Sequence, residues 1–529
     1  MKLQIIKKPA SLFILFFFSF AFLLCATLSN AQSFGYTNPI ISGMNPDPSI
    51  CRVGEDYYTV TSTFLWFPGV PVYHSKDLVN WELIGYSLSR KSQLDLSKGS
   101  GIYAPVIRYN KGTFYMITTN RRNGENFFVT ATNPAGPWSD PIWVEMEGID
   151  PSLFFDDDGK VYFTCAGNNQ CEIDIKTGKR LSEIKCIWGG TGGRYPEGPH
   201  LYKINGYYYL LISEGGTEYG HFISIARSNN PWGPFESNPN NPILTHRNRN
   251  AQSNPIQGTG HADMLQAHDG SWWMVFLAFR ANGTHHHIGR ETYLVPLSWS
   301  SNGWPLVYNG GTADLKMNVA TLPQKPFAKA PEKDEFEGNQ LDLKWNYSKN
   351  PDVTAYSLSD RKGWLRLKPA TETFGGNGFF TFIGQRQTDL NFKASVQIDF
   401  NPVSENEEAG LTVYHRPEGH YDVFIQRQKA KRFIVLRYKL GSITHEEKRL
   451  ELKEDLVQIV ISGNKDMYTF ECVQGTETLL LGKVETKFIS SETLGGFVGA
   501  YIGLYATGNG KKSTTPADFN WFSYKGEDK

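Results

Sequence analysis

Residues 47–60 read Asp-Pro-Ser-Ile-Cys-Arg-Val-Gly-Glu-Asp-Tyr-Tyr-Thr-Val, which is a short strand, a tight turn and a second strand rich in aromatic residues. Two such strands around a glycine-containing turn are typical of a β-hairpin. The same pattern recurs four more times, beginning near residues 104, 150, 197 and 261. Self-similarity of this kind indicates a repeat architecture in which each unit contributes one supersecondary element.

A weaker second pattern follows the hairpins, for example His74-Ser75-Lys76-Asp77 with Trp81, and later Gly136-Pro137-Trp138. Each unit therefore supplies four strands, and five such units over residues 32–321 predict a five-bladed β-propeller. No long stretch repeats its apolar residues with a period of 3.6, so we expect few helices.

A second domain is expected after the repeats. Residues 322–333 are rich in Pro and Lys, as linkers are. Residues 334–529 then alternate apolar and polar side chains in successive segments such as 392–400 and 432–440. This alternation predicts one β-sandwich of the jelly-roll type. The fold class is therefore all-β, and the length of 529 residues suits two domains.

The amino terminus has the features of a targeting segment. Three lysines precede an apolar run over residues 12–24, and small residues follow at 29–31. This arrangement predicts a signal peptide over residues 1–31, cleaved after Ala31, and the apolar run is too short to favour a membrane span. Cys25 follows two leucines instead of a small residue, which disfavours a lipid anchor. We expect export to the periplasm or the extracellular space.

The remaining cysteines form no CxxC pair and no zinc-like spacing. Their number is odd, so we expect buried structural thiols with room for one disulfide. They are Cys51, Cys165, Cys171, Cys186 and Cys472.

Charge and composition exclude one class of function. The chain has 53 Lys and Arg against 53 Asp and Glu, with no basic stripe, so nucleic-acid binding is not expected. Aromatic residues make up 14% of the chain. They fit large β-sheet cores and also fit sugar binding, and composition alone favours the cores.

The starts of the five hairpins carry the candidate chemistry. In a propeller the first strand of each blade lines the central channel, so these positions converge from distant parts of the chain. Three of the five carry a carboxylate, and acids crowded around one pocket repel each other unless catalysis or a metal requires them. The five positions are Asp47, Tyr103-Ala104, Asp150, Glu197 and His261.

Hydrolysis of a glycosidic bond needs a carboxylic acid to protonate the leaving oxygen and a carboxylate to activate water or attack the sugar. Asp47 is a short side chain held between two prolines and suits a general base. Glu197 is longer by one methylene and can reach across the pocket as the general acid. Asp150 comes between them in blade order and suits a modulator of the acid's pKa and orientation.

Four motifs in this order resemble those of glycoside hydrolase family 43, and the resemblance covers residues 41 to about 310. The C-terminal segment also resembles the concanavalin-like β-sandwich attached to many xylosidase-type members. The family inverts anomeric configuration, which implies Asp47 as base, Glu197 as acid and Asp150 as modulator. Inversion predicts that the carboxyl groups of Asp47 and Glu197 lie about 6.5–9.5 Å apart. The motifs are residues 45–49, 150–153, 197–201 and 289–292.

The resemblance implies further site residues. Arg290 matches an arginine that contacts sugar hydroxyls at the non-reducing end, although a salt bridge to Glu291 or another surface acid is the alternative. His261 matches a histidine near the channel centre that in several relatives coordinates calcium through water. No cofactor is required, and a structural calcium near His261 is the one metal to consider. Trp66 and Tyr103 are expected to form walls of the pocket, with core packing as the alternative.

The substrate is expected to be an oligosaccharide or polysaccharide. Xylosidase-type relatives tend to have Trp-Ala-Pro where this chain has Tyr103-Ala104-Pro105, and the segment between Arg280 and Gly289 is short. These departures favour α-L-arabinofuranosyl residues of hemicellulose as the sugar released, from side chains of xyloglucan, arabinoxylan or arabinan. The resemblance to the family implies exo-action at non-reducing ends. The alternatives are a β-D-xylosidase acting on xylo-oligosaccharides and a carbohydrate-binding propeller without activity. An inactive carbohydrate-binding propeller predicts loss of one of the three acids, yet all three are present. The sequence leaves the oligomeric state open.

Overall fold

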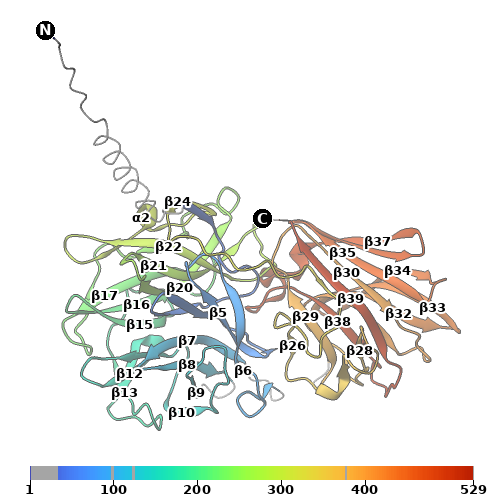
Figure 1. Cartoon of the computed structure of the whole chain (residues 1–529), viewed down its shortest axis with the longest axis horizontal. Coiled ribbons are helices and arrows are strands. Elements are labelled where there is room, and N and C mark those ends of the chain that lie inside the picture. Colours follow the sequence, from blue (N-terminus) through green and yellow to red (C-terminus); the bar gives the residue numbers. More distant parts are fainter. Residues whose placement is uncertain (2–33, 97–100, 122–124, 376–377, 528–529) are drawn as a thin grey trace.

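The computed structural model describes every residue except 2–33, 97–100, 122–124, 376–377 and 528–529. It is nearly all-β, with 51% of residues in strands and 4% in helices, as expected. Two β-domains lie side by side (Figure 1). The expected signal peptide lies outside the described residues apart from Met1. In the described part of the chain no helix is long and apolar enough to cross a membrane.

The first domain is a five-bladed propeller in which the first strand of each blade is innermost. Its antiparallel sheets follow the hairpin repeats. The blades are β2 (Ser49–Val53), β3 (Asp56–Val60), β5 (Gly69–Ser75) and β6 (Glu82–Leu88); β7 (Ile102–Asn110), β8 (Thr113–Asn120), β9 (Glu125–Ala131) and β10 (Ile142–Glu147); β11 (Ser152–Phe155), β12 (Val161–Cys165), β13 (Asn169–Glu172) and β14 (Lys185–Cys186); β15 (Glu197–Ile204), β16 (Tyr207–Glu214), β17 (Phe222–Ser228) and β18 (Glu236–Ser237), with β19 (Leu244–Thr245) beside β17; and β20 (Ile256–Gln266), β21 (Trp272–Arg280), β22 (Glu291–Trp299) and β23 (Pro305–Val307).

The two ends of the propeller are fastened together. β1 (Phe34–Thr37) pairs with β24 (Lys316–Ala320), so the start and the end of the domain form one small sheet. The Asn38 side-chain amide adds a hydrogen bond to the Leu294 carbonyl at 3.0 Å, which ties this sheet to the fifth blade. The inner strands are thereby held in a closed ring, and their first residues keep fixed positions relative to one another.

The second domain is a β-sandwich of two antiparallel sheets. Alternate residues of β32, such as Val423 and Ile425, enter the core between the sheets, as the period of two predicts. One sheet has the order β27 (Tyr356–Ser357), β28 (Leu365–Leu367), β39 (Ala517–Gly526), β30 (Phe392–Asp399), β35 (Leu456–Gly463), β36 (Met467–Gln474) and β37 (Glu477–Glu485), with β25 (Lys333–Asp334) beside β39. The other has the order β29 (Thr381–Arg386), β38 (Tyr501–Thr507), β31 (Glu408–Arg416), β32 (Gly419–Gln428), β33 (Lys431–Leu440) and β34 (Ile443–Glu451).

Helical segments are short and lie between strands. They are η2 (Ala166–Asn168), η3 (Val353–Ala355), η4 (Thr486–Ile489), α2 (Tyr308–Gly311) and α3 (Ser491–Leu494).

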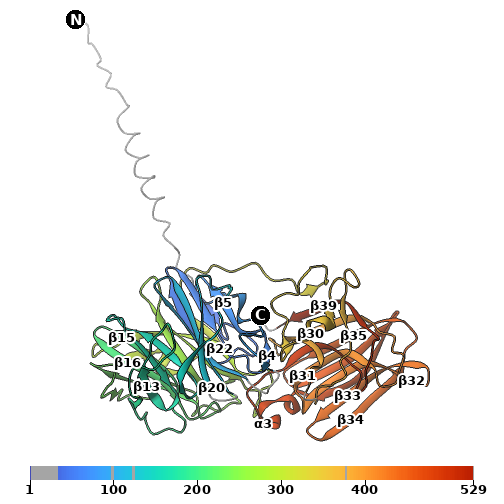
Figure 2. The ribbon, with the colours of Figure 1, turned by 90° about the horizontal axis from the view of Figure 1, so that it is seen from below.

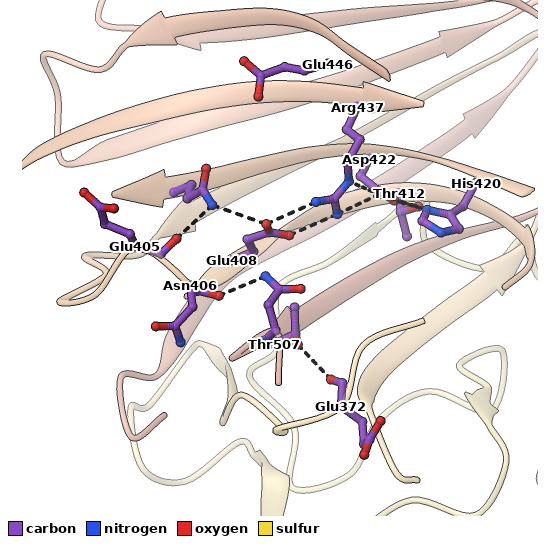
Figure 3. Close-up of polar contacts among 12 residues, drawn as sticks. Glu372, Glu405, Asn406, Glu408, Thr412, His420, Asp422, Arg437, Glu446 and Thr507 are labelled. Carbon is purple, nitrogen blue, oxygen red and sulfur yellow. Dashed lines mark hydrogen bonds and ion pairs between the residues drawn. The ribbon is translucent and has the colours of Figure 1, made fainter. Parts of the chain in front are cut away.

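The sandwich sheet that contains β31, β32 and β33 carries a buried ion network on the face that points away from the core between the two sheets (Figure 3). Arg437 lies between two carboxylates, with contacts of 3.0 Å to both Asp422 and Glu408. Asp422 also accepts a hydrogen bond from Thr412 at 2.8 Å and contacts His420 at 2.9 Å. Because these buried charges are paired with one another, we interpret the network as structural.

The two domains share a substantial interface (Figure 2). β4 (Trp66–Phe67) of the propeller pairs with β26 (Tyr347–Ser348), which follows β25 in the C-terminal domain. The Trp66 ring stacks on Tyr501 with centroids 3.6 Å apart, and Arg386 donates to the Met44 carbonyl at 2.8 Å. Continuous pairing and aromatic packing of this kind fix the sandwich against the first blade.

The expectation of one disulfide is not met among the described cysteines. All five are free thiols, four of them buried and Cys186 exposed. Burial raises the pKa of Cys51 and Cys165 to about 12, so these two are inert structural thiols.

Candidate active site

A cavity of about 290 Å³ contains the three acids that the repeat was expected to bring together. Asp47, Asp150 and Glu197 come from the first, third and fourth blades and all line it. His261 and Arg290 of the fifth blade also line it. The other lining residues are Phe64, Tyr103, Arg121, Ile149, Thr217 and Phe497.

Each of the five inner strands has a residue in the left-handed region just before it or within it. The φ angles are 55° at Asp47, 40° at Ala104, 57° at Asp150, 57° at Gly198 and 47° at His261. This conformation is costly for residues other than glycine, and such strain often gathers at functional sites. Because the five positions share this backbone conformation, they face the same axis of the propeller.

This alignment corrects one expectation. Gly198, and not Glu197, occupies the position equivalent to Asp47 and Asp150, so the glutamate stands one residue earlier in its repeat. A Cβ atom on Gly198 would lie 3.1 Å from the His261 ring, and glycine therefore leaves room for that ring. Glu197 still reaches the cavity, from the residue before the turn.

Asp47 is held as a carboxylate. Its Oδ1 lies 3.1 Å from Arg290 Nη1 and 3.9 Å from His261 Nδ1, and its Oδ2 accepts a hydrogen bond from Ser62. Burial alone would raise the pKa of Asp47, but Arg290, His261 and Ser62 outweigh it and hold the pKa below its usual range. A buried carboxylate that stays ionised is suited to take a proton from water.

Asp150 and Glu197 form a second, interacting pair. Burial raises the pKa of Asp150 to about 7, with the charges of Glu197 and Asp47 adding to the effect. Burial would also raise the pKa of Glu197, but the contact with His221 lowers it below the usual range. Below about pH 7 the two carboxyls thus hold one proton, which rests on Asp150 in the free protein. Since the interaction is reciprocal, an ionised Asp150 favours a protonated Glu197.

His221 is a site residue that sequence reasoning missed. It is fully buried just before β17, with Nε2 3.2 Å from Glu197 Oε1. No strand-start motif marks it, because it comes from a turn between the second and third strands of its blade. The available signal is Gly260, whose absent side chain leaves the space that the His221 ring fills.

Arg290 lies where the resemblance implies. Its Nη1 bonds Asp47 at 3.1 Å and Thr217 at 2.8 Å, while its buried Nε has no protein partner. The alternative of a salt bridge to Glu291 does not form, because Glu291 pairs with Arg280 at 2.8 Å. The guanidinium therefore lines the cavity beside the acids, and its fork of N–H donors suits recognition of sugar hydroxyls.

The expected aromatic walls are half right. Tyr103 lines the cavity, with its hydroxyl accepting a hydrogen bond from Arg121 at 2.7 Å. Trp66 does not line this cavity, because its ring is packed against Tyr501 at the domain interface and is 3% exposed, but it does line an adjoining cavity of about 540 Å³. Phe64, two residues earlier, lies there instead.

The donors beneath His261 do not fit a calcium ion. Asp263, two residues along the same strand, already accepts hydrogen bonds from Ser49 at 2.7 Å and from Tyr202 at 2.6 Å. It is also paired with Arg108 at 2.7 Å. The Arg108 guanidinium thus places a positive charge among the inner strands, and among the described residues no group of three or more His, Cys, Asp or Glu side chains could hold a metal.

Phe497, from the sandwich, forms one wall of the cavity and also lines two larger ones. A cavity of about 540 Å³ adjoins it through Phe64, Tyr103, Arg121 and Phe497. Another of about 500 Å³ adjoins it through Thr217, Arg290 and Phe497. Phe497 is therefore the one residue common to the three linings.

The loop that carries Phe497 is fixed by a close backbone contact. A Cβ atom on Gly499 would lie 1.8 Å from the Ile288 carbonyl, so only glycine fits there. The next residue, Ala500, donates its N–H to the His287 carbonyl at 2.9 Å. The sandwich thereby supplies part of the site wall at a set position.

Comparisons with known proteins match both domains. Residues 36–305 match the model of glycosyl hydrolases family 43, and residues 333–525 match the β-xylosidase C-terminal concanavalin A-like domain. The chain is 44% identical to the non-reducing end α-L-arabinofuranosidase BoGH43B of Bacteroides ovatus, over 94% of this chain and 96% of that protein. It is 39% identical to a xylosidase/arabinosidase of Butyrivibrio fibrisolvens, over 92% of this chain and 98% of that protein.

Solved structures agree in fold along nearly the whole chain. The structure described as Bacteroides ovatus xyloglucan PUL GH43B matches with a TM-score of 0.89 at 44% identity, covering 93% of this chain and all of that one. A xylan β-1,4-xylosidase from Bacillus halodurans matches with a TM-score of 0.88 at 34% identity and the same coverage. The propeller and sandwich are thus arranged as in these enzymes.

Proposed function

Because the chain belongs to glycosyl hydrolases family 43, we propose that it is an inverting glycoside hydrolase that releases α-L-arabinofuranosyl residues from non-reducing ends. The observation that carries this proposal is the set of three acids in one small cavity, with Asp47 held ionised and a single proton shared by Asp150 and Glu197. One charged base and one protonated acid are what single displacement at an anomeric carbon requires.

The reaction follows from these states. Asp47 accepts a proton from a water molecule as the water oxygen bonds to the anomeric carbon. The bond from that carbon to the leaving oxygen breaks, and Glu197 donates its proton to that oxygen. Before this step the proton that rests on Asp150 in the free protein passes to Glu197 as Asp150 becomes ionised, and Arg290 contacts the bound sugar from the cavity wall. The configuration at the anomeric carbon is inverted, since water attacks from the face opposite the leaving group.

The shape of the cavity supports exo-action. A volume of about 290 Å³ suits one pentose, and Phe497 also lines the two adjoining cavities. The rest of the substrate then occupies a neighbouring cavity at the domain interface. A terminal sugar fits such a pocket, whereas an internal sugar needs an exit on both sides.

The choice of arabinose rests on sequence similarity. The relative with 44% identity is a non-reducing end α-L-arabinofuranosidase, and the matching structure is described by its xyloglucan locus. Xyloglucan side chains are therefore the favoured parent substrate. Release of β-D-xylose is the second candidate, because the xylosidase/arabinosidase relative and the xylan xylosidase structure share the fold. Export by an N-terminal signal peptide would place the enzyme where it meets such polymers.

Initial rates on p-nitrophenyl α-L-arabinofuranoside and p-nitrophenyl β-D-xylopyranoside test this function. We expect faster release from the arabinofuranoside, and loss of at least a hundredfold on natural oligosaccharides in Glu197→Gln. The matched control is Glu236→Gln, which changes an exposed glutamate on the outer strand of the same blade. Faster release of xylose would favour the second candidate, and a folded protein that hydrolyses neither glycoside would contradict the proposal.

A further inference from the structure

We propose that His221 is a positioning residue for the general acid, which holds the Glu197 carboxyl toward the leaving oxygen through its Nε2–H group. This inference rests on the proposed function. Nε2 lies 3.2 Å from Glu197 Oε1, and neither ring nitrogen has another hydrogen-bond partner among the described residues. A neutral imidazole carries one N–H, and only the tautomer with that N–H on Nε2 directs it at an acceptor.

The contact is within reach without being aligned as a formed hydrogen bond. Catalytic hydrogen bonds are often long or poorly aligned in a free enzyme and tighten when substrate binds. His221 is therefore poised to tighten on Glu197 when a sugar fills the cavity. A fully buried polar ring with no other partner would otherwise be an unexplained cost to folding.

The absence of a side chain at Gly260 leaves the space that the His221 ring fills. A Cβ atom on Gly260 would lie 2.0 Å from the His221 ring, so any other residue there would displace it. Gly260 directly precedes His261 on β20, and the register of β20 with β21 shifts on both sides of Gly260. The irregular strand thus serves two histidines, one beside Asp47 and one beside Glu197.

The charged groups divide between the two catalytic carboxyls. Arg290 and His261 face Asp47 at 3.1 Å and 3.9 Å. The charges of Asp150, His261 and Asp47 act on Glu197, and His221 is the donor that contacts it. The base is therefore positioned by one set of groups and the acid by another.

The contact with His221 affects how Glu197 donates its proton. A donor that favours the anion of Glu197 makes the carboxyl a readier proton donor, and the fixed direction keeps its proton near the leaving oxygen. Loss of His221 should raise the pKa of the pair and weaken protonation of poor leaving groups. Leaving groups that depart without a proton should be affected little.

The experiment compares His221→Ala with wild type on aryl α-L-arabinofuranosides whose phenols differ in acidity, and on an arabinose-bearing oligosaccharide. We expect kcat/KM to fall about a hundredfold on the oligosaccharide and less than about threefold on the 2,4-dinitrophenyl glycoside. The alkaline limb of the pH profile should move up by about one unit, as expected when a donor to a charged group is lost. His221→Gln, which keeps an N–H donor, should recover part of the loss.

Two controls separate the outcomes. His246→Ala removes another buried histidine of the propeller, bonded to the backbone of Ile256 and Ala313, and reports simple destabilisation. In Glu197→Gln, adding His221→Ala should cost nothing more on the oligosaccharide. An equal loss on all leaving groups with an unmoved alkaline limb would overturn the inference. A wild type inactive on every arabinofuranoside would instead refute the proposed function.

Discussion

Replacing Asp150 with Asn should stabilise the protein strongly at pH 8 and much less at pH 5. Burial, with the charges of Glu197 and Asp47, raises the pKa of Asp150 to about 7. In an unfolded chain the pKa of an aspartate is about 3.9. The folded protein keeps this proton between about pH 4 and pH 7 while the unfolded chain has lost it, so the stability that the group contributes falls as pH rises through that window.

The size of the effect follows from the shift. Each unit of pKa corresponds to about 1.36 kcal/mol, so an ionised Asp150 costs about 4 kcal/mol above pH 7. Part of that cost is already present at pH 5, and the advantage of Asp150→Asn should grow by about 2–3 kcal/mol between pH 5 and pH 8. Activity should be lost, because the pair can no longer exchange its proton.

Urea unfolding followed by tryptophan fluorescence at both pH values measures this difference. The control is Asp157→Asn, which removes a carboxylate of the same blade whose side chain is 85% exposed. Its effect should be small and nearly the same at both pH values. An advantage of Asp150→Asn that does not grow with pH would refute the account of a proton held by burial.

Three further predictions concern the surroundings of the acids. Ala104 has a φ of 40° at a position that carries no acid, so Ala104→Gly should raise the free energy of unfolding by about 1 kcal/mol with activity retained. A loss of stability in thermal unfolding would contradict the strain. Phe497→Ala should join the acid cavity to both neighbours and reduce the selectivity for terminal over internal residues by about tenfold, or about 1.4 kcal/mol, in product analysis by chromatography. Unchanged selectivity would show that Phe497 is not the barrier. Dialysis against EDTA should leave the rate and the melting temperature unchanged, because the Asp263 carboxylate is already paired with Arg108. A loss of rate or stability that calcium restores would contradict this expectation.

The convergence of the acids was predictable because a repeat fixes both the number of blades and the position of each inner strand. Asp47 and Asp150 precede the same proline and serine, and the structure gives both the same left-handed backbone. Glu197 was placed one residue out of register. Its glycine neighbour hid the equivalence, since a glycine carries no side chain to compare with an aspartate.

The contribution of other elements could not be predicted in this way. Phe497 reaches the cavity from the sandwich, and His221 from a turn, so neither shares a repeat position with the acids. Trp66 was expected in the wall of the pocket, with core packing as the alternative, because an aromatic ring can serve either purpose. Only the packing of Tyr501 against its ring decides between them. Gly260 and Gly499 are needed because a Cβ atom there would clash with a neighbouring residue. That need is recognised only once the position of the neighbour is known.

The stereochemistry of the first product tests the central claim most directly. Proton NMR during the first seconds of hydrolysis of an aryl α-L-arabinofuranoside distinguishes the two anomers before they interconvert in water. With Asp47 activating water and Glu197 protonating the leaving oxygen, the first product should be β-L-arabinofuranose, and its signal should be absent with Glu197→Gln on poor leaving groups. Initial release of the α-anomer would mean a covalent intermediate on a carboxylate and would contradict the single-displacement account.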